Sequence, residues 1–247
     1  GTTDEVVAVT LQNEGVNVGE DVFVAHCPER VLPGRILIEL IENDRVVGGI
    51  NEVSTQVAVE FYENFVRGDV LATNAKTAEL VKLTENSSRD VQIAFANEIS
   101  MISDSEGINA WEVIELANRH PRVNILNPGP GVGGHCIAVD PWFIVDRAPQ
   151  CSNLIRTARE VNDSKPKWVI DRVRSKAEKF KNPVIGCLGL AFKADVDDLR
   201  ESPAMGIVHA LQAENIGSIL VCEPNLKASD TFDLKPLNVV IAESDIL

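Results

Sequence analysis

Residues 75 to 106 contain neither glycine nor proline, the two residues that most often interrupt a helix. Apolar residues recur through this stretch at Leu80, Val81, Leu83, Val91, Ile93, Phe95, Ile99 and Ile102. The pattern predicts one helix near the upper end of the lengths found in globular proteins. The helix is apolar enough to be central in the fold.

Helix-like and strand-like segments alternate on both sides of this helix. Before it, we predict helices at residues 4–13 and 54–66, the second capped by Ser54, and strands at 22–25 and 46–50. After it, we predict helices at 110–118, 153–163, 164–180 and 203–215, and strands at 184–190, 217–222 and 238–242. This alternation is typical of an α/β fold. Both ends suggest a piece of a longer protein, because the chain begins in a turn and stops as an apolar run begins.

The composition is that of a globular protein, with 45% hydrophobic and 24% charged residues. The formal net charge of −14 argues against a nucleic-acid or anionic-membrane partner, because no basic face can offset such an excess. No signal peptide and no long apolar run are present. We therefore expect a cytoplasmic protein without a membrane partner.

The cysteines are scattered and odd in number, and no two form a C-x-x-C pair: they are Cys27, Cys136, Cys151, Cys187 and Cys222. This pattern favours reduced thiols over a disulfide framework. We also expect no metal site. The pairs His26-Cys27 and His135-Cys136 hold adjacent side chains that point apart on an extended chain, and no second paired motif supports them.

Cys136 follows a glycine-rich run, Gly129-Pro130-Gly131-Val132-Gly133-Gly134-His135, and precedes Asp140-Pro141. The backbone amides of such a turn can stabilise anions, and a thiol is a useful nucleophile only as its thiolate. Two interpretations are open: a reactive cysteine, or a small buried hydrophobic residue beside a structural turn. Asp140 is likewise either a catalytic carboxylate or a helix N-cap followed by proline.

Polar residues mark one face of the long helix. Lys82 and Asn86 lie at i and i+4, and Asp90 and Asn97 approximately continue that face. A solvated stripe is the simpler interpretation for a surface helix. On a central helix, however, the lysine would need a partner or a ligand.

Two glycine motifs are candidates for phosphate binding. Residues 129–134 match G-x-G-x-x-G, but no β-α-β unit surrounds them, so we reject a dinucleotide fingerprint there. Residues 186–203 are better placed, because they run from a strand through a loop to a helix. Lys193 and Arg200 of this loop can meet phosphates at the carboxyl edge of a sheet. The alternative is a surface loop of mixed charge.

Four segments, in their order and spacing, resemble the UDP-glucose/GDP-mannose dehydrogenase family. They are His26-Cys27-Pro28-Glu29-Arg30-Val31-Leu32-Pro33-Gly34, Glu79-Leu80-Val81-Lys82-Leu83-Thr84-Glu85-Asn86, residues 131–140, and residues 189–193 through Arg200-Glu201-Ser202-Pro203. The form Gly-Val-Gly-Gly-His-Cys-Ile-Ala-Val-Asp-Pro-Trp-Phe, with Asn118 to Asn124 before it, resembles the branch that acts on UDP-N-acetyl-D-mannosamine.

The resemblance implies three parts. Residues 1–73 would be the tail of an N-terminal NAD-binding Rossmann domain, whose first β-α-β unit and glycine fingerprint are absent. Residues 74–164 would be a central domain with a long dimerisation helix and the cysteine loop. Residues 165–247 would be an incomplete Rossmann-like domain with a parallel sheet that binds the UDP-sugar. A homodimer or higher homo-oligomer would form through the central helix.

The resemblance also implies a reaction. NAD would accept the electrons of two successive oxidations at the C6 alcohol of a UDP-sugar, which give a uronate for polysaccharide precursor synthesis. Cys136 would capture the intermediate aldehyde as a thiohemiacetal that becomes a thioester. Lys82 would steady the C6 oxygen. Asn86 and Asp140 would hold water and Lys82, and Glu29 would be the base for hydrolysis.

The remaining site residues would bind the substrate or the cofactor. Arg30 and Val31 would line the sugar site, Lys193 would meet the UDP diphosphate, Arg122 would reach the substrate of a neighbouring subunit, and Arg200 would approach NAD. Alternatives remain for the function. The chain could be a non-catalytic module that binds a UDP-sugar and dimerises, or the sugar could be UDP-GlcNAc or UDP-glucose. The piece alone is expected to be inactive, because half of the cofactor cradle is missing.

Overall fold

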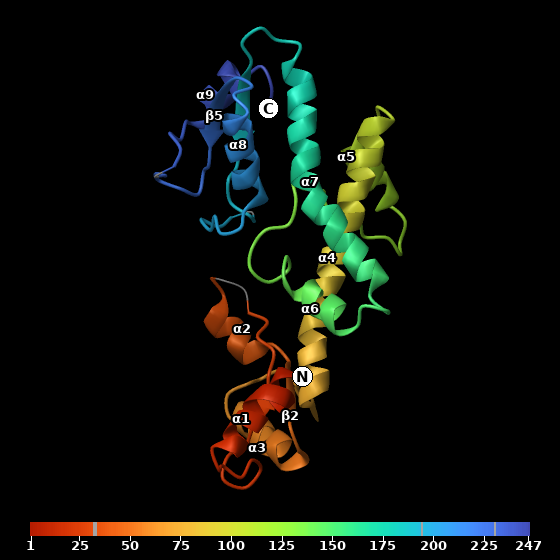
Figure 1. Cartoon of the computed structure of the whole chain (residues 1–247), viewed down its shortest axis with the longest axis vertical. Helices are drawn as coiled ribbons and strands as arrows, with labels where there is room; N and C mark the ends of the chain where they lie inside the picture. The colour runs from red at the N-terminus through yellow and green to blue at the C-terminus, as the bar shows by residue number, and fades with distance from the viewer. Residues whose placement is uncertain (32–33, 194, 230) are drawn as a thin grey trace. The chain divides into compact units, whose positions relative to one another are not determined.

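The computed structural model of the chain describes residues 1–31, 34–193, 195–229 and 231–247. Leu32 and Pro33 of the first family segment, and Ala194 within the last, lie outside the described residues. The structure divides into two compact units, Gly1–Glu85 and Asn86–Leu247. Helix α4 (Ala75–Ser105) begins in the first unit and ends in the second, and it confirms the long helix predicted from residues 75–106 (Figure 1).

The first unit is built around a three-stranded sheet with the order β1-β2-β3. Strand β1 (Ala25–His26) is antiparallel to β2 (Arg45–Gly49), and β2 is parallel to β3 (Val70–Asn74). Helix α3 (Glu52–Glu63) connects the two parallel strands. The predicted strand at residues 22–25 is therefore shorter, and it begins three residues later and ends one residue later, because only Ala25 and His26 find a paired backbone in β2.

Local chemistry decides where α3 begins. The side-chain oxygen of Asn51 accepts a hydrogen bond of 2.8 Å from the N–H of Ser54, so Asn51 is the N-cap. The prediction of Ser54 as N-cap was wrong. Ser54 is instead buried, and its hydroxyl accepts from the N–H of Val24 at 3.3 Å. The unit also contains a π-helical turn, η1 (Thr3–Ala8), and helices α1 (Val9–Asn13) and α2 (Ile36–Glu42).

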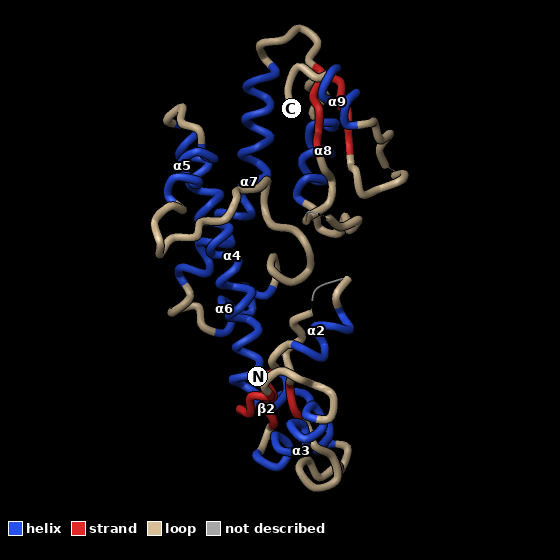
Figure 2. The backbone as a smooth tube through the Cα atoms, turned by 180° about the vertical axis from the view of Figure 1, so that it is seen from behind, coloured by secondary structure: helices blue, strands red, loops and turns tan. Residues whose placement is uncertain are grey.

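The second unit joins a helical part to a small parallel sheet. After α4 come α5 (Ala110–Ala117), α6 (Asp140–Arg147) and α7 (Asn153–Ala177), followed by β4 (Val184–Leu188), α8 (Pro203–Ala213), β5 (Ser218–Cys222) and α9 (Leu237–Glu243). Figure 2 shows α8 and α9 beside the two strands, which are drawn in red. Two buried clusters fill the space around the sheet: Leu190, Val208, Val221 and Phe232, and Ile185, Ile207 and Leu211.

Helix α7 is one continuous helix, whereas the sequence predicted two that meet at residues 163 and 164. Pro166 lies inside it and removes one backbone hydrogen bond, which ordinarily breaks or kinks a helix. Buried side chains precede the proline on the same helix, among them Arg159, Asn162 and Lys165. Their tertiary contacts offset the lost bond.

Residues 238–242 form helix α9, so the predicted strand there was wrong. The next strand-like pairing follows α9, where the N–H of Asp245 donates to the carbonyl of Val184 at 2.8 Å. The N–H of Gly186 donates to the carbonyl of Ile246 at 2.8 Å, with parallel pairing between Ile185 and Ile246. A parallel return requires a crossover, and α9 supplies it despite its β-branched residues.

This order of pairing creates a switch point. Strand β5 lies on one side of β4, and residues 245–246 lie on the other. In open α/β sheets, ligands bind outside the carboxyl ends of the strands at the point where the strand order reverses. The loop that leaves the carboxyl end of β4, described at residues 189–193 and 195–202, is therefore placed where a ligand is expected.

Candidate active site

Cys136 lies exposed on the loop between α5 and α6. Its carbonyl oxygen accepts hydrogen bonds from the N–H groups of Val139, at 3.0 Å, and Asp140, at 2.8 Å. These bonds close a tight turn that leads directly into α6. The structure excludes the interpretation of Cys136 as a buried hydrophobic residue, and it leaves the thiol accessible to a ligand.

Two of the glycines before Cys136 are required, Gly133 by close packing and Gly134 by its backbone conformation. A Cβ on Gly133 would lie 2.6 Å from the carbonyl oxygen of Glu201 and 2.7 Å from Cβ of Phe192, distances that real Cβ atoms essentially never show. Gly134 has a φ of 80°, a conformation that favours glycine. The cysteine loop and the loop after β4 therefore pack against each other, which brings two of the four family segments together.

Asp140 is held by the long helix. The side-chain Nδ2 of Asn86 donates to Oδ2 of Asp140 at 2.5 Å, so the structure brings together these two predicted site residues. Asp140 is the first residue of α6, and the N-cap is Val139, which makes no side-chain cap. The carboxylate is thus engaged by Asn86, and the alternative role of Asp140 as N-cap is wrong.

The loop after β4 is fixed by a carboxylate that sequence analysis missed. Oε2 of Glu223 accepts the N–H groups of Leu190, at 2.6 Å, and Ala191, at 3.0 Å, while Oε1 accepts the N–H of Asn225 at 2.9 Å. Burial raises the pKa of Glu223, but these bonds together outweigh it and leave that pKa below its usual value. An acidic residue directly after the buried strand β5 was a signal that could have found it. Ser202 adds a bond of 2.6 Å from its hydroxyl to the carbonyl of Leu190.

The predicted phosphate-binding residues of this loop differ in their surroundings. Lys193 is exposed. Arg200 is also exposed and donates to both carboxylate oxygens of Asp198, with Nη2 at 2.6 Å and Nε at 2.9 Å. The Arg200 side chain and N–H are the main causes that lower the pKa of Asp198 to about 2, with a smaller contribution from His135 of the cysteine loop. Arg122, predicted to reach a neighbouring subunit, is exposed.

The predicted residues of the first unit form a group of their own. Nζ of Lys82 donates to the backbone carbonyl of Glu29 at 2.8 Å. The guanidinium of Arg30 forms an ion pair of 2.6 Å with Glu85, and Val31 is half-buried. Lys82, Glu29, Arg30 and Val31 are thus brought together. On α4, Lys82 precedes Asn86 by one helical turn.

Arg45 is a second residue that sequence analysis missed. It is 2% exposed on β2, and its Nη1 lies 3.4 Å from Oε1 of Glu29 while Nη2 donates to the carbonyl of Leu40 at 3.1 Å. The N–H groups of Arg30 and Val31 also donate to Oε1 of Glu29. Partial burial raises the pKa of Glu29, but these donors and Arg45 together leave that pKa below its usual value. Glu29 is therefore kept as a carboxylate, the form that a general base needs.

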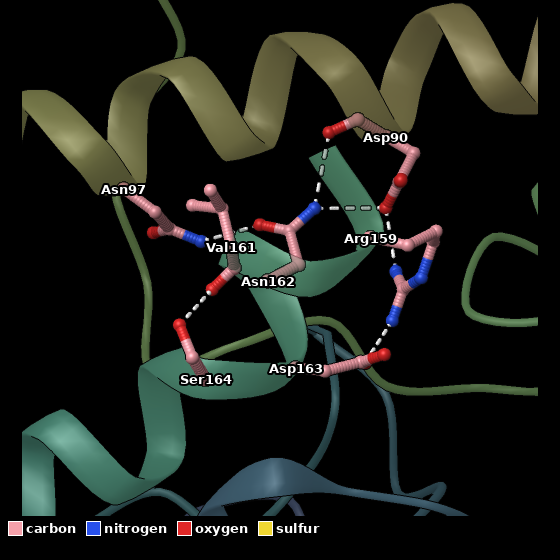
Figure 3. A network of polar contacts seen from close by, with 7 residues as sticks. All are labelled: Asp90, Asn97, Arg159, Val161, Asn162, Asp163 and Ser164. Carbon is pink, nitrogen blue, oxygen red and sulfur yellow. Dashed lines mark hydrogen bonds and ion pairs between the residues drawn. The ribbon is translucent and has the colours of Figure 1, made fainter. Parts of the chain in front are cut away.

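A buried polar network links α4 to α7 (Figure 3). Oδ1 of Asp90 accepts from Nη1 of Arg159 at 2.6 Å and from Nδ2 of Asn162 at 2.8 Å. Oδ1 of Asn162 accepts from Nδ2 of Asn97 at 2.9 Å. Asp90 and Asn97 are fully buried, so the interpretation of this face as a solvated stripe was wrong for these two positions. The partners on α7 could not be identified from periodicity alone.

Lys165, also on α7, is 3% exposed and was not singled out by the sequence. Its Nζ donates to the hydroxyl of Ser100 at 2.5 Å and lies 4.1 Å from the ring centroid of Trp168. Burial lowers the pKa of Lys165 to about 8, while the charge of Asp104 opposes that shift. Among the described residues, no group of three or more His, Cys, Asp or Glu could hold a metal ion.

Three models of one protein family match consecutive parts of the chain. The NAD binding domain of the UDP-glucose/GDP-mannose dehydrogenase family matches residues 1–66, its central domain matches residues 76–164, and its UDP binding domain matches residues 186–246. The chain belongs to the UDP-glucose/GDP-mannose dehydrogenase family. The resemblance inferred from four short segments is confirmed, and the domain limits at residues 73 and 164 stay predictions.

Curated relatives within this family share more than half of the aligned residues. The chain is 64% identical over 207 residues to the NDP-N-acetyl-D-galactosaminuronic acid dehydrogenase of Ralstonia solanacearum, which is 84% of this chain and 49% of that protein. It is 55% identical, over an alignment of 248 residues, to the UDP-N-acetyl-D-mannosamine dehydrogenase of Escherichia coli K12, and this match covers 93% of this chain and 58% of that protein. The chain thus spans about half the length of the curated relatives it matches.

Solved structures show the same fold. The UDP-D-ManNAc dehydrogenase of Pyrococcus horikoshii matches with a TM-score of 0.88 and 40% identity, and the match covers 99% of this chain and 58% of that one. The α/β architecture with parallel sheets, predicted from the sequence, is therefore confirmed. Across the described ranges, no helix combines the length and apolar character needed to cross a membrane.

The first unit contains one part of a family NAD site. Strands β2 and β3 and the helix α3 between them form a parallel β-α-β unit. β2 and α3 lie within the residues that match the NAD binding domain, and β3 follows them. Residues 129–134, which match the glycine pattern literally, lie in the second unit on a loop that no strand directly precedes. Among the described residues of the first unit, no G-x-G-x-x-G turn joins a strand to a helix. The unit therefore does not by itself fit the dinucleotide pyrophosphate.

Proposed function

We propose that the chain contributes the cysteine loop and the UDP-binding part of an NAD-dependent UDP-sugar 6-dehydrogenase, which oxidises a C6 alcohol to a uronate in two steps. One observation carries the proposal. An exposed Cys136 lies on a loop that is tied to Asp140 and Asn86 and that packs against the loop at the carboxyl end of β4. A nucleophile and a nucleotide-binding edge are thus parts of one packed unit.

The thiol of Cys136 explains how one site performs two oxidations. The first oxidation removes two electrons and two protons from the C6 alcohol and leaves an aldehyde. The Cys136 thiolate then forms an S–C bond to the aldehyde carbon, and the oxygen takes up a proton to give a thiohemiacetal. The second oxidation converts this adduct to a thioester. Attack by water breaks the S–C bond, releases the carboxylate and returns the thiolate. NAD, when bound, accepts the hydride in each oxidation.

The other predicted catalytic residues have supporting roles. Asp140 and Asn86 are hydrogen-bonded to each other and would orient a water at the cysteine loop. Lys82 would offset the negative charge that develops on the C6 oxygen. Glu29 would take the proton from the attacking water, a role that fits its lowered pKa and the carboxylate form. The roles of Lys82 and Glu29 come from the family resemblance.

We propose UDP-N-acetyl-D-mannosamine as the substrate, with the UDP diphosphate held near Lys193 at the carboxyl edge of β4. The UDP binding domain model matches residues 186–246, and this range includes Lys193. The two curated relatives are named for different sugars, but each name contains an N-acetylated amino sugar. Arg30 and Val31 would line the sugar, Arg122 would act across a homo-oligomer formed through α4, and Arg200 would approach NAD once released from Asp198. Five free cysteines agree with a cytoplasmic location.

The test replaces Cys136 by serine in a protein of the relatives' full length that carries this sequence. Uronate release from UDP-ManNAc should fall to background, because serine forms no thioester. Cys151→Ser is the matched control, since Cys151 is also exposed and lies outside the glycine loop. Normal uronate release by Cys136→Ser would refute covalent catalysis. Parallel assays with UDP-GlcNAc and UDP-glucose decide the sugar.

The 247-residue chain by itself is expected to show no NAD-dependent turnover, because the described part of its first unit lacks a cradle for the pyrophosphate. Calorimetry with UDP-ManNAc and with NAD, each added separately to the chain, measures what it binds. Binding of the sugar nucleotide without NAD is the expected result. A steady NADH signal from the chain alone would contradict this account of the cofactor site.

A further inference from the structure

One face of α4 holds both ends of the segment 129–140, which carries Cys136. At the Asp140 end, Nδ2 of Asn86 donates to the carboxylate. At the other end, the N–H of Gly129 donates to Oδ1 of Asn97 at 2.9 Å. Asn86 and Asn97 are about three helical turns apart, so they lie on the same face of the helix. The glycine-rich loop is therefore tied at its first and last residues to one rigid element.

The tie at Gly129 depends on which way the Asn97 amide faces. A side-chain amide has one oxygen acceptor and one nitrogen donor, and only the oxygen can accept the N–H of Gly129. The nitrogen of Asn97 donates to Oδ1 of Asn162 at 2.9 Å. A flipped Asn97 would place a donor against the Gly129 N–H and an acceptor against the Asn162 oxygen, which loses both bonds in a buried site.

The carboxylate of Asp90 sets this direction, because it only accepts hydrogen bonds. It accepts Nδ2 of Asn162, and this orients the Asn162 oxygen toward Asn97 (Figure 3). Burial raises the pKa of Asp90, while Arg159, which donates to the same carboxylate oxygen at 2.6 Å, opposes that shift and favours the charged form. The series Asp90, Asn162, Asn97 and Gly129 therefore has a single favourable orientation.

We propose that Asn97 is a positioning residue for Cys136, and that the buried Asp90–Asn162 pair acts through it. The proposal rests on the proposed function for the role of Cys136 as nucleophile. Glycines let the loop take many conformations, and fixing its two ends limits how far the sulfur can move. A displacement of about 1 Å at a reacting atom can cost about 100-fold in rate.

The first test uses the 247-residue chain and needs no turnover. Iodoacetamide alkylation of Cys136 and of Cys151 is followed separately by peptide mass spectrometry across pH, in the wild type and in Asn97→Leu. The exposed Cys151 is the internal control. In Asn97→Leu, the ratio of the two alkylation rates should move at least about threefold toward the ratio measured in the urea-unfolded chain, where neither thiol is positioned. An unchanged ratio in the folded variant would overturn the proposal.

Two further variants separate positioning from general stability. Asn162→Leu removes one of the links between α4 and α7 but leaves the acceptor oxygen of Asn97, so the variant should lose stability with a smaller change in the ratio. Gly129→Pro removes the donor N–H and places a ring carbon against the Asn97 oxygen, so it breaks the same tie from the loop side and should reproduce the ratio of Asn97→Leu. It serves if Asn97→Leu does not fold. A folded Gly129→Pro variant with the wild-type ratio would refute the proposal, because the tie to Asn97 would then be broken without any effect on Cys136.

The full-length protein gives the corresponding kinetic result. Asn97→Leu should lower kcat for uronate release about 10- to 100-fold and change KM for the UDP-sugar little, since the sugar nucleotide is not bound by Asn97. The two proposals fail in different ways. An active Cys136→Ser enzyme refutes the proposed function while the alkylation ratio still tests the positioning. A wild-type ratio in Asn97→Leu refutes the positioning even if Cys136→Ser is inactive.

Discussion

Replacing Arg159 by methionine should be among the most destabilising single changes in the second unit. Arg159 is 1% exposed and Asp90 is fully buried, and Nη1 donates to Oδ1 at 2.6 Å. In Arg159→Met the carboxylate keeps the Asn162 amide but loses its counter-charge. A charged group that is buried without a partner loses its hydration, and no ion pair compensates for that loss.

The loss of unfolding free energy in Arg159→Met can be estimated from these contacts. At an effective dielectric of about 20, two charges about 4 Å apart attract by about 4 kcal/mol. Removal of one partner of a buried pair typically costs about 3–5 kcal/mol. With a urea slope of about 1–3 kcal/mol per molar, the unfolding midpoint should fall by about 2 M.

Tryptophan fluorescence is a suitable assay, because Trp111, Trp142 and Trp168 all lie in the second unit. Urea unfolding of the chain is compared for the wild type, for Arg159→Met and for the double variant Asp90→Leu/Arg159→Met. The double variant removes both charges and leaves the backbone carbonyl of residue 90, which still accepts from Asn162 at 3.1 Å. It should recover most of the lost stability.

The matched control is Arg174→Met, because Arg174 pairs with Glu214 at 2.7 Å on the surface. Exposed ion pairs contribute little, so its midpoint should barely move. A loss in Arg159→Met no larger than in this control would refute the assignment of a buried, paired charge. So would a double variant that is less stable than the single one.

The pH dependence of Arg159→Met gives a second check. Burial raises the pKa of Asp90, and the charge of Arg159 opposes that shift. Without the arginine, the pKa rises further, so the folded variant gains a proton more readily than the unfolded chain does. A group with a raised folded pKa is favoured as pH falls. The stability gap between the variant and the wild type should therefore narrow from about pH 7 to about pH 5, and a gap that widens would contradict the argument.

Three further predictions concern the loops. Gly133→Ala should destabilise the second unit by about 1–3 kcal/mol in the same urea assay, because its Cβ would meet a backbone oxygen at 2.6 Å, whereas Gly129→Ala, with 3.9 Å of room, should not. The ionised Glu223 contributes to the free energy of unfolding above the pKa that its carboxyl has in the unfolded chain. This contribution is lost as pH falls through the lower pKa of the folded state, and Glu223→Gln should remove it. Its stability should therefore vary less than that of the wild type between about pH 5 and about pH 3. Arg45→Met should raise the pKa of Glu29 in a carboxyl NMR titration, and an unchanged value would show that the backbone donors alone hold it low.

Much of this protein follows from local sequence. The long helix at 75–105 is set by the absence of glycine and proline over many turns, and helical periodicity persists whatever the helix packs against. The strands β2, β4 and β5 were found because short apolar runs end in glycine or polar residues. Cys136 stood out because a glycine turn before a thiol is a local pattern with a chemical meaning.

Tertiary structure alone decided which polar residues are buried. Asp90 and Asn97 look like any polar residues on a helix face, and only Arg159 and Asn162, from a segment far along the chain, make their burial possible. The β-branched α9 became a helix because the parallel sheet needed a crossover, although its residues favour a strand. Periodicity is a property of neighbours in sequence, whereas the partner of a buried polar group is chosen by the fold.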